Sequence, residues 1–253
     1  MGRHQSGSVL LNNMNSRQLF DAGKLNAAIE ALGAELRDNP ADAQRRTFLF
    51  ELLCFAGNHD RADKQLDVLS SGGPEAGMGA LLYRSALHAE RTRAEMFRNK
   101  TFPLDSAPAD DVAGTLNGKP FSSIEDGDPR IGARLEVFAA GQYMWIPWQH
   151  VASLKIEPPK RLRDLLWAPA ILKTTEEFKA QQDLGELLLP ALTPLSFDST
   201  DDDIRLGRAT DWIDLPDGDF AAIGQKVVMV DGEQIPLLSI RELEIHPAEK
   251  AVS

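Results

Sequence analysis

A repeat with a period of 34 residues is the feature that most constrains how this 253-residue chain can fold. Within the segments 16–38 and 48–70, residues that lie 34 positions apart match, so that residues 16–36 come into register with residues 50–70. This period is typical of the tetratricopeptide repeat, a helix–turn–helix unit, so the N-terminal part is predicted to be a stack of helical hairpins. The matched pairs are Leu19 and Leu53, Ala22 and Ala56, Gly23 and Gly57, Ala28 and Ala62, Leu32 and Leu66, and Pro40 and Pro74.

The matched glycines, alanines and prolines stand where a helical hairpin is most demanding. Gly23 and Gly57 are expected to end the first helix of each hairpin, because glycine accepts the left-handed backbone of a sharp turn. Ala28 and Ala62 are small enough to let two helices approach closely. A proline after each second helix stops that helix at the repeat junction.

A third helix is predicted over residues 75–98, without the glycine of the repeat, and is expected to cap the stack. Two repeats and a cap are near the lower limit for a helical stack that stands alone, so we expect the helices to lean on a second domain. The inward face of the third helix is predicted to carry Met78, Leu81, Leu82, Ser85 and Ala89.

The second half of the chain changes to a period of two, which predicts strands. The segments RIGARLEVF, QYMWIPW and VASLKIEP alternate in this way, and VVMV and EQIPLL flank an Asp-Gly turn typical of a hairpin. LRDLLW (162–167) fits a single helical turn, whereas residues 171–180 fit a strand or a short helix equally well. The predicted fold class is α+β: a lead without fixed structure at 1–15, tetratricopeptide-like helices at 16–98, a linker rich in Pro, Asp, Gly and Ser at 99–120, and a small, mostly β, acidic domain, a twisted sheet or barrel, at 121–253.

Residues 141–148, GQYMWIPW, hold one of the two tyrosines and two of the four tryptophans of the chain. Tyr143 and Trp145 are two positions apart, so they share one face of the predicted strand. We expect this pair to be packed inside the protein. A ligand cage with Glu136 or Asp128 as acidic partner is the alternative.

The charge of the chain is −11 and is unevenly divided, with +1 on residues 1–100 and −12 on residues 101–253. An acidic second half repels phosphate backbones, so we expect no nucleic-acid partner. The sequence lacks a run of ~20 apolar residues and a signal peptide, which predicts a cytoplasmic protein that does not insert into membranes. The single cysteine, Cys54, is expected to be a buried hydrophobic residue.

The sequence offers little that is typical of catalysis. The five histidines lack metal-ligand spacing, and the nucleophile, phosphate-loop and dinucleotide motifs are absent, so we predict no catalytic residue, no metal and no cofactor. Two carboxylate groups remain, Asp126 with Asp128, and Asp201–Asp203. We expect solvated turns, the first shaped by an ion pair with Arg130, while a carboxylate-dependent hydrolase of unknown substrate is the alternative.

Several motifs are distinctive when they occur together. They are RIGARLEV, the aromatic GQYMWIP, LRDLLWAPA and LGRATDW in the second half, and LFDAGKLNAAIEAL followed by NPAD near the start. This combination resembles the ImpE/SciE-type accessory proteins of bacterial type VI secretion, also called TagJ. The resemblance covers nearly the whole chain.

The resemblance implies a non-enzymatic cytoplasmic adaptor. Such a protein would bind the small subunit of the contractile sheath through that subunit's N-terminal helix, and would influence how the AAA+ ATPase disassembles contracted sheath. Two grooves could receive the helix: the concave face of the helical array, or the junction between the domains. A structural protein that associates with itself through its helices is a further alternative. Aromatic residues and arginine are enriched at interface hot spots, so the predicted partner contacts are Phe50, Leu53, Tyr83, Trp148, Arg163 and Trp167.

Overall fold

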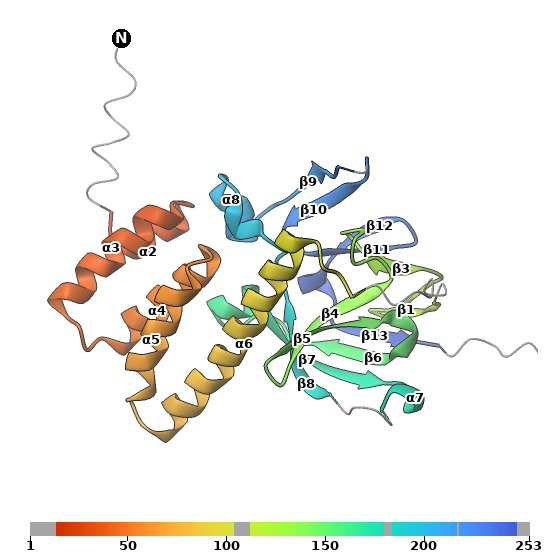
Figure 1. Cartoon of the computed structure of the whole chain (residues 1–253), viewed down its shortest axis with the longest axis horizontal. Helices are drawn as coiled ribbons and strands as arrows, with labels where there is room; N and C mark the ends of the chain where they lie inside the picture. The colour runs from red at the N-terminus through yellow and green to blue at the C-terminus, as the bar shows by residue number, and fades with distance from the viewer. Residues whose placement is uncertain (1–13, 104–111, 180–183, 217, 247–253) are drawn as a thin grey trace, which may run out of the picture.

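The computed structural model of the chain describes residues 14–103, 112–179, 184–216 and 218–246, and the predicted lead falls almost entirely outside them. The described chain is α+β, with helices first and sheets second, as predicted. The helices lie side by side in one layer, and the last of them, α6, lies next to the sheet (Figure 1). They are α2 (Ser16–Asp21), α3 (Leu25–Asp38), α4 (Ala43–Phe55), α5 (His59–Ser70) and α6 (Pro74–Asn99).

The predicted helical hairpins are confirmed, and their two turns have the same backbone geometry. Gly23 has φ +68° and Gly57 has φ +67°, so both adopt the left-handed conformation that favours glycine. The matched Leu19 and Leu53 are both buried. Pro74 is the first residue of α6, where its missing N–H is not needed.

The predicted inward face of α6 is wrong for its three largest apolar residues. Met78, Leu81 and Leu82 are 75%, 65% and 51% exposed. The helix instead buries another face, which includes Ala80, Ala86 and Leu87, and the small alanines on this face let α6 pack closely on its neighbours. Ala89 is buried as predicted.

The second half is built on an eight-stranded antiparallel sheet with the order β2-β1-β13-β6-β7-β8-β4-β5. Among the described residues β2 and β5 have no further strand beside them, so the sheet is open and not a closed barrel. The first two strands lie inside the segment predicted to be a linker. The strands are β1 (Gly114–Leu116), β2 (Lys119–Phe121), β4 (Arg134–Ala139), β5 (Gln142–Pro147), β6 (Val151–Ile156), β7 (Trp167–Thr174), β8 (Gly185–Pro190) and β13 (Glu242–Ile245).

The smaller predicted elements are also present. The Asp-Gly hairpin is formed by β11 (Val227–Val230) and β12 (Glu233–Pro236), and β11 also pairs with β3 (Ile124–Asp126) in a second sheet. A 3-10 turn, η2 (Leu162–Leu165), stands where the single helical turn was predicted. The ambiguous segment holds both alternatives, since β7 ends at Thr174 and α7 (Glu176–Lys179) follows. A third sheet pairs β9 (Thr210–Asp214) with β10 (Phe220–Gly224), and both strands follow α8 (Asp202–Arg205) along the chain.

Two hydrophobic cores hold the molecule together. One lies within the large sheet and contains Leu135, Ile146 and Trp148. The other contains the buried residues of the helices and also Trp167 and Leu192 from the second half. Because this second core is shared, the helical layer leans on the sheet as predicted.

Candidate functional site

The open apolar site lies where α6 meets the sheet. We call it the junction groove, a hollow of about 490 Å³. Its size is that of a pocket that receives large apolar side chains. The groove is lined by Leu82, Tyr83, Ser85 and Ala86 of α6, Phe138 of β4, Ala140 and Gly141 of the β4–β5 turn, Lys155 and Glu157 at the end of β6, Pro169, Ala170 and Ile171 of β7, and Glu186, Leu187 and Leu188 of β8.

The lining combines small and large apolar residues. Gly141 has φ +79°, and a Cβ there would lie 3.4 Å from the side chain of Ser85, so the β4–β5 turn comes close to α6. Among the lining residues, Leu82 of α6 and Ile171 of β7 are 51% and 45% exposed. Large apolar side chains this exposed on a soluble protein often mark a contact surface.

Ionised side chains stand among the lining residues of the sheet. Lys155 pairs with Glu242 at 2.6 Å, and Glu157 pairs with Lys160 at 3.0 Å. Glu186 is exposed and stands opposite Ile171 in the β7–β8 ladder. An apolar centre with a polar rim is typical of protein–protein interfaces.

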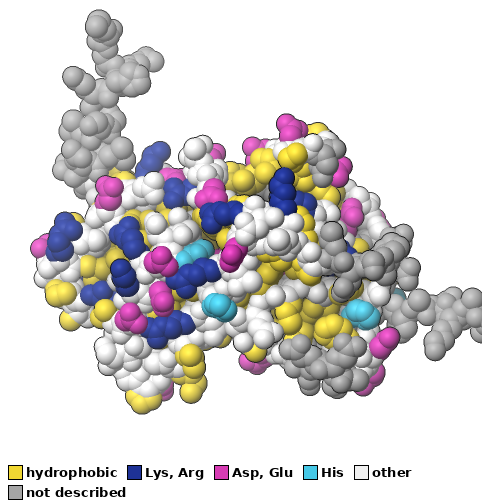
Figure 2. Space-filling model, in the orientation of Figure 1, with side chains coloured by type: hydrophobic (Ala, Val, Ile, Leu, Met, Phe, Trp, Pro, Cys, Tyr) yellow, Lys and Arg dark blue, Asp and Glu magenta, His cyan; other side chains and the backbone are white. Residues whose placement is uncertain are grey.

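Hydrophobic side chains also show at the lower end of the helical layer, where α6 begins (Figure 2). The exposed Met78 and Leu81 lie in this first part of α6. Lys and Arg side chains cover much of the remaining helical layer, interspersed with Asp and Glu (Figure 2). Met78 lies about one helical turn before Leu82, the first residue of α6 that lines the junction groove.

Four of the six predicted contact residues meet in one cluster between the layers. The rings of Tyr83 and Trp167 are stacked with centroids 6.1 Å apart, and Phe50 lies 5.9 Å from Tyr83 and 6.3 Å from Trp167. The guanidinium of Arg163 lies over Tyr83 at 4.7 Å and pairs with Glu51 at 3.4 Å. The helical and β-side residues named from the sequence are thus neighbours.

The burial of most of these residues corrects the exposure that the sequence suggested. Phe50, Leu53, Trp148 and Trp167 are at most 2% exposed, because their side chains fill the two cores. They leave no surface for a partner in this conformation. Tyr83, which also lines the junction groove, and Arg163 keep part of their surface.

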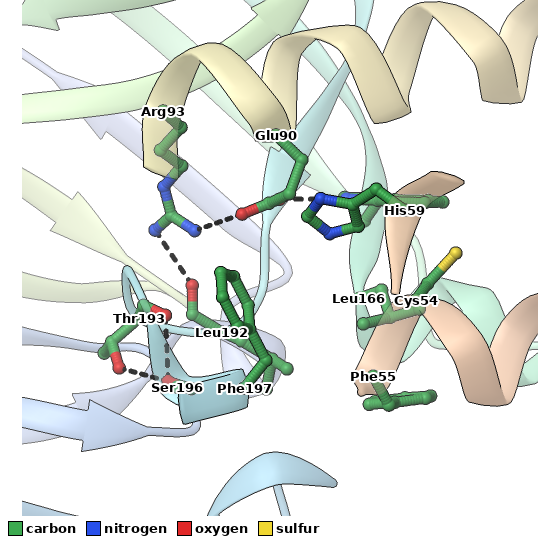
Figure 3. Close-up of a pocket in the computed structure, with 11 residues that line it drawn as sticks. Cys54, Phe55, His59, Glu90, Arg93, Leu166, Leu192, Thr193, Ser196 and Phe197 are labelled. Carbon is green, nitrogen blue, oxygen red and sulfur yellow. Dashed lines mark hydrogen bonds and ion pairs between the residues drawn. The ribbon is translucent and has the colours of Figure 1, made fainter. Parts of the chain in front are cut away.

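The concave helical face, one of the two predicted grooves, is largely filled by the second half of the chain. His59 packs edge-on against Phe197 at 5.6 Å, and a cavity of only about 20 Å³ remains there. Figure 3 shows Glu90 and Arg93 reaching into this cavity from α6, with His59 and Cys54 on the other side. Such a space holds about one water molecule and no side chain of a partner.

The buried cysteine is confirmed. Cys54 lines this small cavity, and burial raises the pKa of its thiol well above the ordinary value. A thiol held neutral in this way is a poor nucleophile.

The aromatic pair of β5, Tyr143 and Trp145, is packed, as expected. Trp145 stacks on Phe102 at 5.8 Å and donates its indole N–H to the Tyr143 hydroxyl, which donates to Glu136. The opposite face of the strand, with Met144 and Ile146, belongs to the core of the sheet. These contacts leave no open cage.

The prediction that Asp126 and Asp128 are solvated turn residues is wrong, because both side chains are buried. The Asp126 carboxylate accepts from the Lys226 Nζ at 2.5 Å. This contact takes the place of the water that would surround the carboxylate of a turn on the surface. Asp128 is also buried and forms the predicted ion pair with Arg130, at 2.6 Å.

The second carboxylate group has a separate, structural role. Asp201 caps α8, and Asp202 accepts from the backbone N–H of Leu25 and pairs with Arg205. The described residues contain no group of His, Cys, Asp and Glu that could hold a metal ion. The two carboxylate groups do not line a common cavity, which removes the support for a hydrolase.

Within the described ranges, no helix is both long and apolar enough to cross a bilayer.

The lining residues that the sequence reasoning missed are those of β4, β7 and β8. Ile171 stands in an alternating segment, but alternation does not say which face of a strand is covered. Leu82 was visible as an apolar residue of α6, but it was assigned to the inner face.

The fold has a close match among solved structures. The crystal structure of protein VPA1032 from Vibrio parahaemolyticus superposes with a TM-score of 0.79, covering 91% of this chain and 97% of that one, at 23% identity. At this identity the match shows the fold alone.

Sequence comparisons show the family. The type VI secretion system accessory component TagJ of Pseudomonas aeruginosa is 32% identical, and the match covers 98% of this chain and 96% of the relative. The family model for the ImpE protein matches residues 118–244, which include most of the sheet and the β-side lining of the junction groove. The chain therefore belongs to the ImpE family, whose TagJ member is an accessory component of type VI secretion.

Proposed function

We propose that this protein is a non-enzymatic, cytoplasmic adaptor of a type VI secretion system that binds a helix of a partner protein in the junction groove. The partner proposed is the small subunit of the contractile sheath, through its N-terminal helix. By holding that helix, the adaptor influences how the AAA+ ATPase takes contracted sheath apart.

The observation that supports this proposal is the apolar groove itself. It is open, it is about 490 Å³ in volume, and its lining includes the exposed Leu82 of α6 and Ile171 of β7. An amphipathic helix recognises such a groove with apolar residues at positions i, i+3 or i+4, and i+7. Where the second half packs against the helical layer, at His59 and Phe197, a cavity of only about 20 Å³ remains.

The test is a titration of the full chain with a peptide of the sheath subunit's N-terminal helix from the same secretion cluster. We expect binding tighter than ~100 μM, since helix-in-groove contacts commonly exceed that affinity. Leu82→Glu and Ile171→Glu are each expected to weaken binding at least ~10-fold, because each places a charge in the apolar contact.

The matched control is Val68→Glu. Val68 is also an exposed apolar residue of the helical layer, at 47%, but it lies on α5 and does not line the junction groove. Its affinity should equal that of the unaltered chain. If the peptide does not bind, or if the three variants weaken it equally, the groove is not its site.

Self-association is a second candidate that one observation favours. Met78 and Leu81, at 75% and 65% exposure, form an exposed apolar surface in the first part of α6, within about one helical turn of Leu82. Such a surface can meet a second copy of the chain. Light scattering over a range of concentrations separates the two candidates, since an adaptor without self-association keeps its monomer mass at all of them.

A further inference from the structure

Four ionised side chains form a buried cluster where α6 meets the sheet, and we call them the charge cluster. They are Arg93 of α6, Glu136 of β4, Lys226 and Asp126, each at most 4% exposed. The Lys226 Nζ lies 2.5 Å from both Glu136 and Asp126. The four side chains are therefore buried together, an arrangement that costs desolvation and must be matched by good geometry.

Arg93 makes the contacts that connect different elements. Its guanidinium donates to both carboxylate oxygens of Glu136, at 2.8 Å each, and to the backbone oxygen of Leu192 at 2.9 Å. It also pairs with Glu90 on its own helix at 3.1 Å. Arginine presents its donors in a rigid fork, so a bidentate bond fixes direction as well as distance.

The elements that Arg93 connects are walls of the junction groove. Helix α6 supplies Leu82 and Ala86, β4 supplies Phe138 two residues beyond Glu136, and Leu192 lies two residues after the end of β8, which supplies Leu187 and Leu188. One guanidinium thus fixes three of the segments that line the site.

We infer that Arg93, with Glu136, is the positioning residue that sets the shape of the junction groove before a partner arrives, an inference that rests on the proposed function. A groove prepared in this way binds its helix without the cost of ordering its own walls.

The state of Glu136 supports a permanent clamp. Burial alone would raise the pKa of Glu136, but the charges of Arg93 and Lys226 outweigh burial and hold it at about 2. The carboxylate therefore stays ionised at neutral pH. Tyr143 also donates its hydroxyl to Glu136, which ties the neighbouring strand β5 to the same centre.

The test removes both partners of the clamp, and Glu90, which loses its ion pair with Arg93, keeps the hydrogen bond from the Trp167 indole N–H at 3.2 Å. The double variant Arg93→Met/Glu136→Met keeps the Lys226–Asp126 pair, and the exchange of a buried ion pair for apolar residues is often neutral for stability. Groove shape is measured between spin labels at Leu81→Cys on α6 and Lys173→Cys on β7, in a Cys54→Ala background. Both label sites are exposed and do not line the groove.

We expect the double variant to fold with a urea midpoint near that of the unaltered chain, with a shifted or broadened distance distribution. Its affinity for the sheath-subunit peptide should fall at least ~10-fold, although every lining residue is intact. A merely structural role would change the midpoint and leave distance and affinity as they were.

The control is Arg91→Met. Arg91 lies two residues before Arg93 on α6, and the change removes only its exposed ion pair with Asp60. It should leave distance and affinity unchanged. Arg93→Lys is the second variant, because lysine keeps the charge but lacks the fork, and it should shift the distances even if the double variant does not fold.

Unchanged distances in Arg93→Lys and in the folded double variant would overturn the inference. The distance measurement needs no partner, so it decides the positioning role even if the peptide fails to bind the unaltered chain. In that case the proposed function fails separately.

Discussion

At the scale of single residues, the buried charged side chains and the one cysteine thiol have structural roles. Asp126 and Asp128, which the sequence predicted to be solvated turn residues, lie inside and pair with Lys226 and Arg130. Burial raises the pKa of Asp126, and the effect of this shift on stability can be measured.

Asp126→Asn tests the buried carboxylate through pH. Burial is the largest effect on Asp126, Lys226 offsets part of it, and the pKa rises from the ordinary value of 3.8 to about 7. A raised folded pKa gives stability that is fully present below the unfolded value and is lost as pH rises through 7. Relative to the variant, the unaltered chain should lose roughly 2–4 kcal/mol of unfolding free energy between pH 4 and pH 7.

Urea unfolding of both proteins at pH 4, 5.5 and 7 gives this difference directly. Glu136, whose pKa is lowered to about 2, titrates in both proteins, so its contribution to the difference in unfolding free energy cancels to a first approximation. Two parallel stability curves would mean that Asp126 is ionised in the folded protein over the whole range.

The thiol of Cys54 should be inert in the folded protein. It is buried, and its raised pKa keeps it neutral at pH 8. A thiol-specific chromogenic reagent is expected to react only after denaturant is added, with one equivalent per chain. Fast reaction under native conditions would show that the interface between α4 and the sheet opens readily.

At the scale of elements, the repeat turns are where the sequence is least free. Gly57 has φ +67°, and a Cβ there would lie 2.5 Å from the ring of Phe197. The turn between α4 and α5 is therefore shaped by the second half of the chain as well as by the hairpin.

Gly57→Ala should destabilise the protein by roughly 1–3 kcal/mol, through backbone strain and overlap with Phe197. Gly33→Ala is the matched control, because Gly33 lies inside α3 with nothing within 4 Å of its added Cβ. Alanine there should stabilise by about 0.5–1 kcal/mol, since it lowers the entropy that the helix costs. Equal effects of the two changes, measured by urea unfolding, would contradict this account.

At the scale of the whole molecule, the helical layer and the sheet share one core. Phe50 contacts Trp167, and Arg93 connects α6 to β4 and to Leu192. Two units that bury such residues against each other are expected to unfold together.

The full chain should therefore show a single unfolding transition. Far-ultraviolet circular dichroism, which reports mainly the helices, and tryptophan fluorescence, which reports the sheet through Trp148 and Trp167, should have the same urea midpoint. A fragment of residues 14–103 should lose most of its cooperative transition, because Phe50 and Phe97 would face water. A fragment as stable as the full chain would show that the layers are independent.

The sequence by itself determined the elements and their order. The 34-residue period with Gly23 and Gly57 predicted the hairpins, and the alternation in RIGARLEVF and QYMWIPW predicted β4 and β5, because local periodicity and turn geometry depend on nearby residues alone. The motifs together also indicated the family that the comparisons show.

Only the tertiary structure decided which face of each element is covered. Helix α6 has two apolar faces, and packing chose the one with Ala80 and Leu87, which left Leu82 at the junction groove. Asp126 and Glu136 became a buried centre because Lys226 and Arg93 arrive from distant parts of the chain. Contacts between segments about 40 to 100 residues apart carry no local pattern, so they follow from the fold and not from the spacing of residues along the chain.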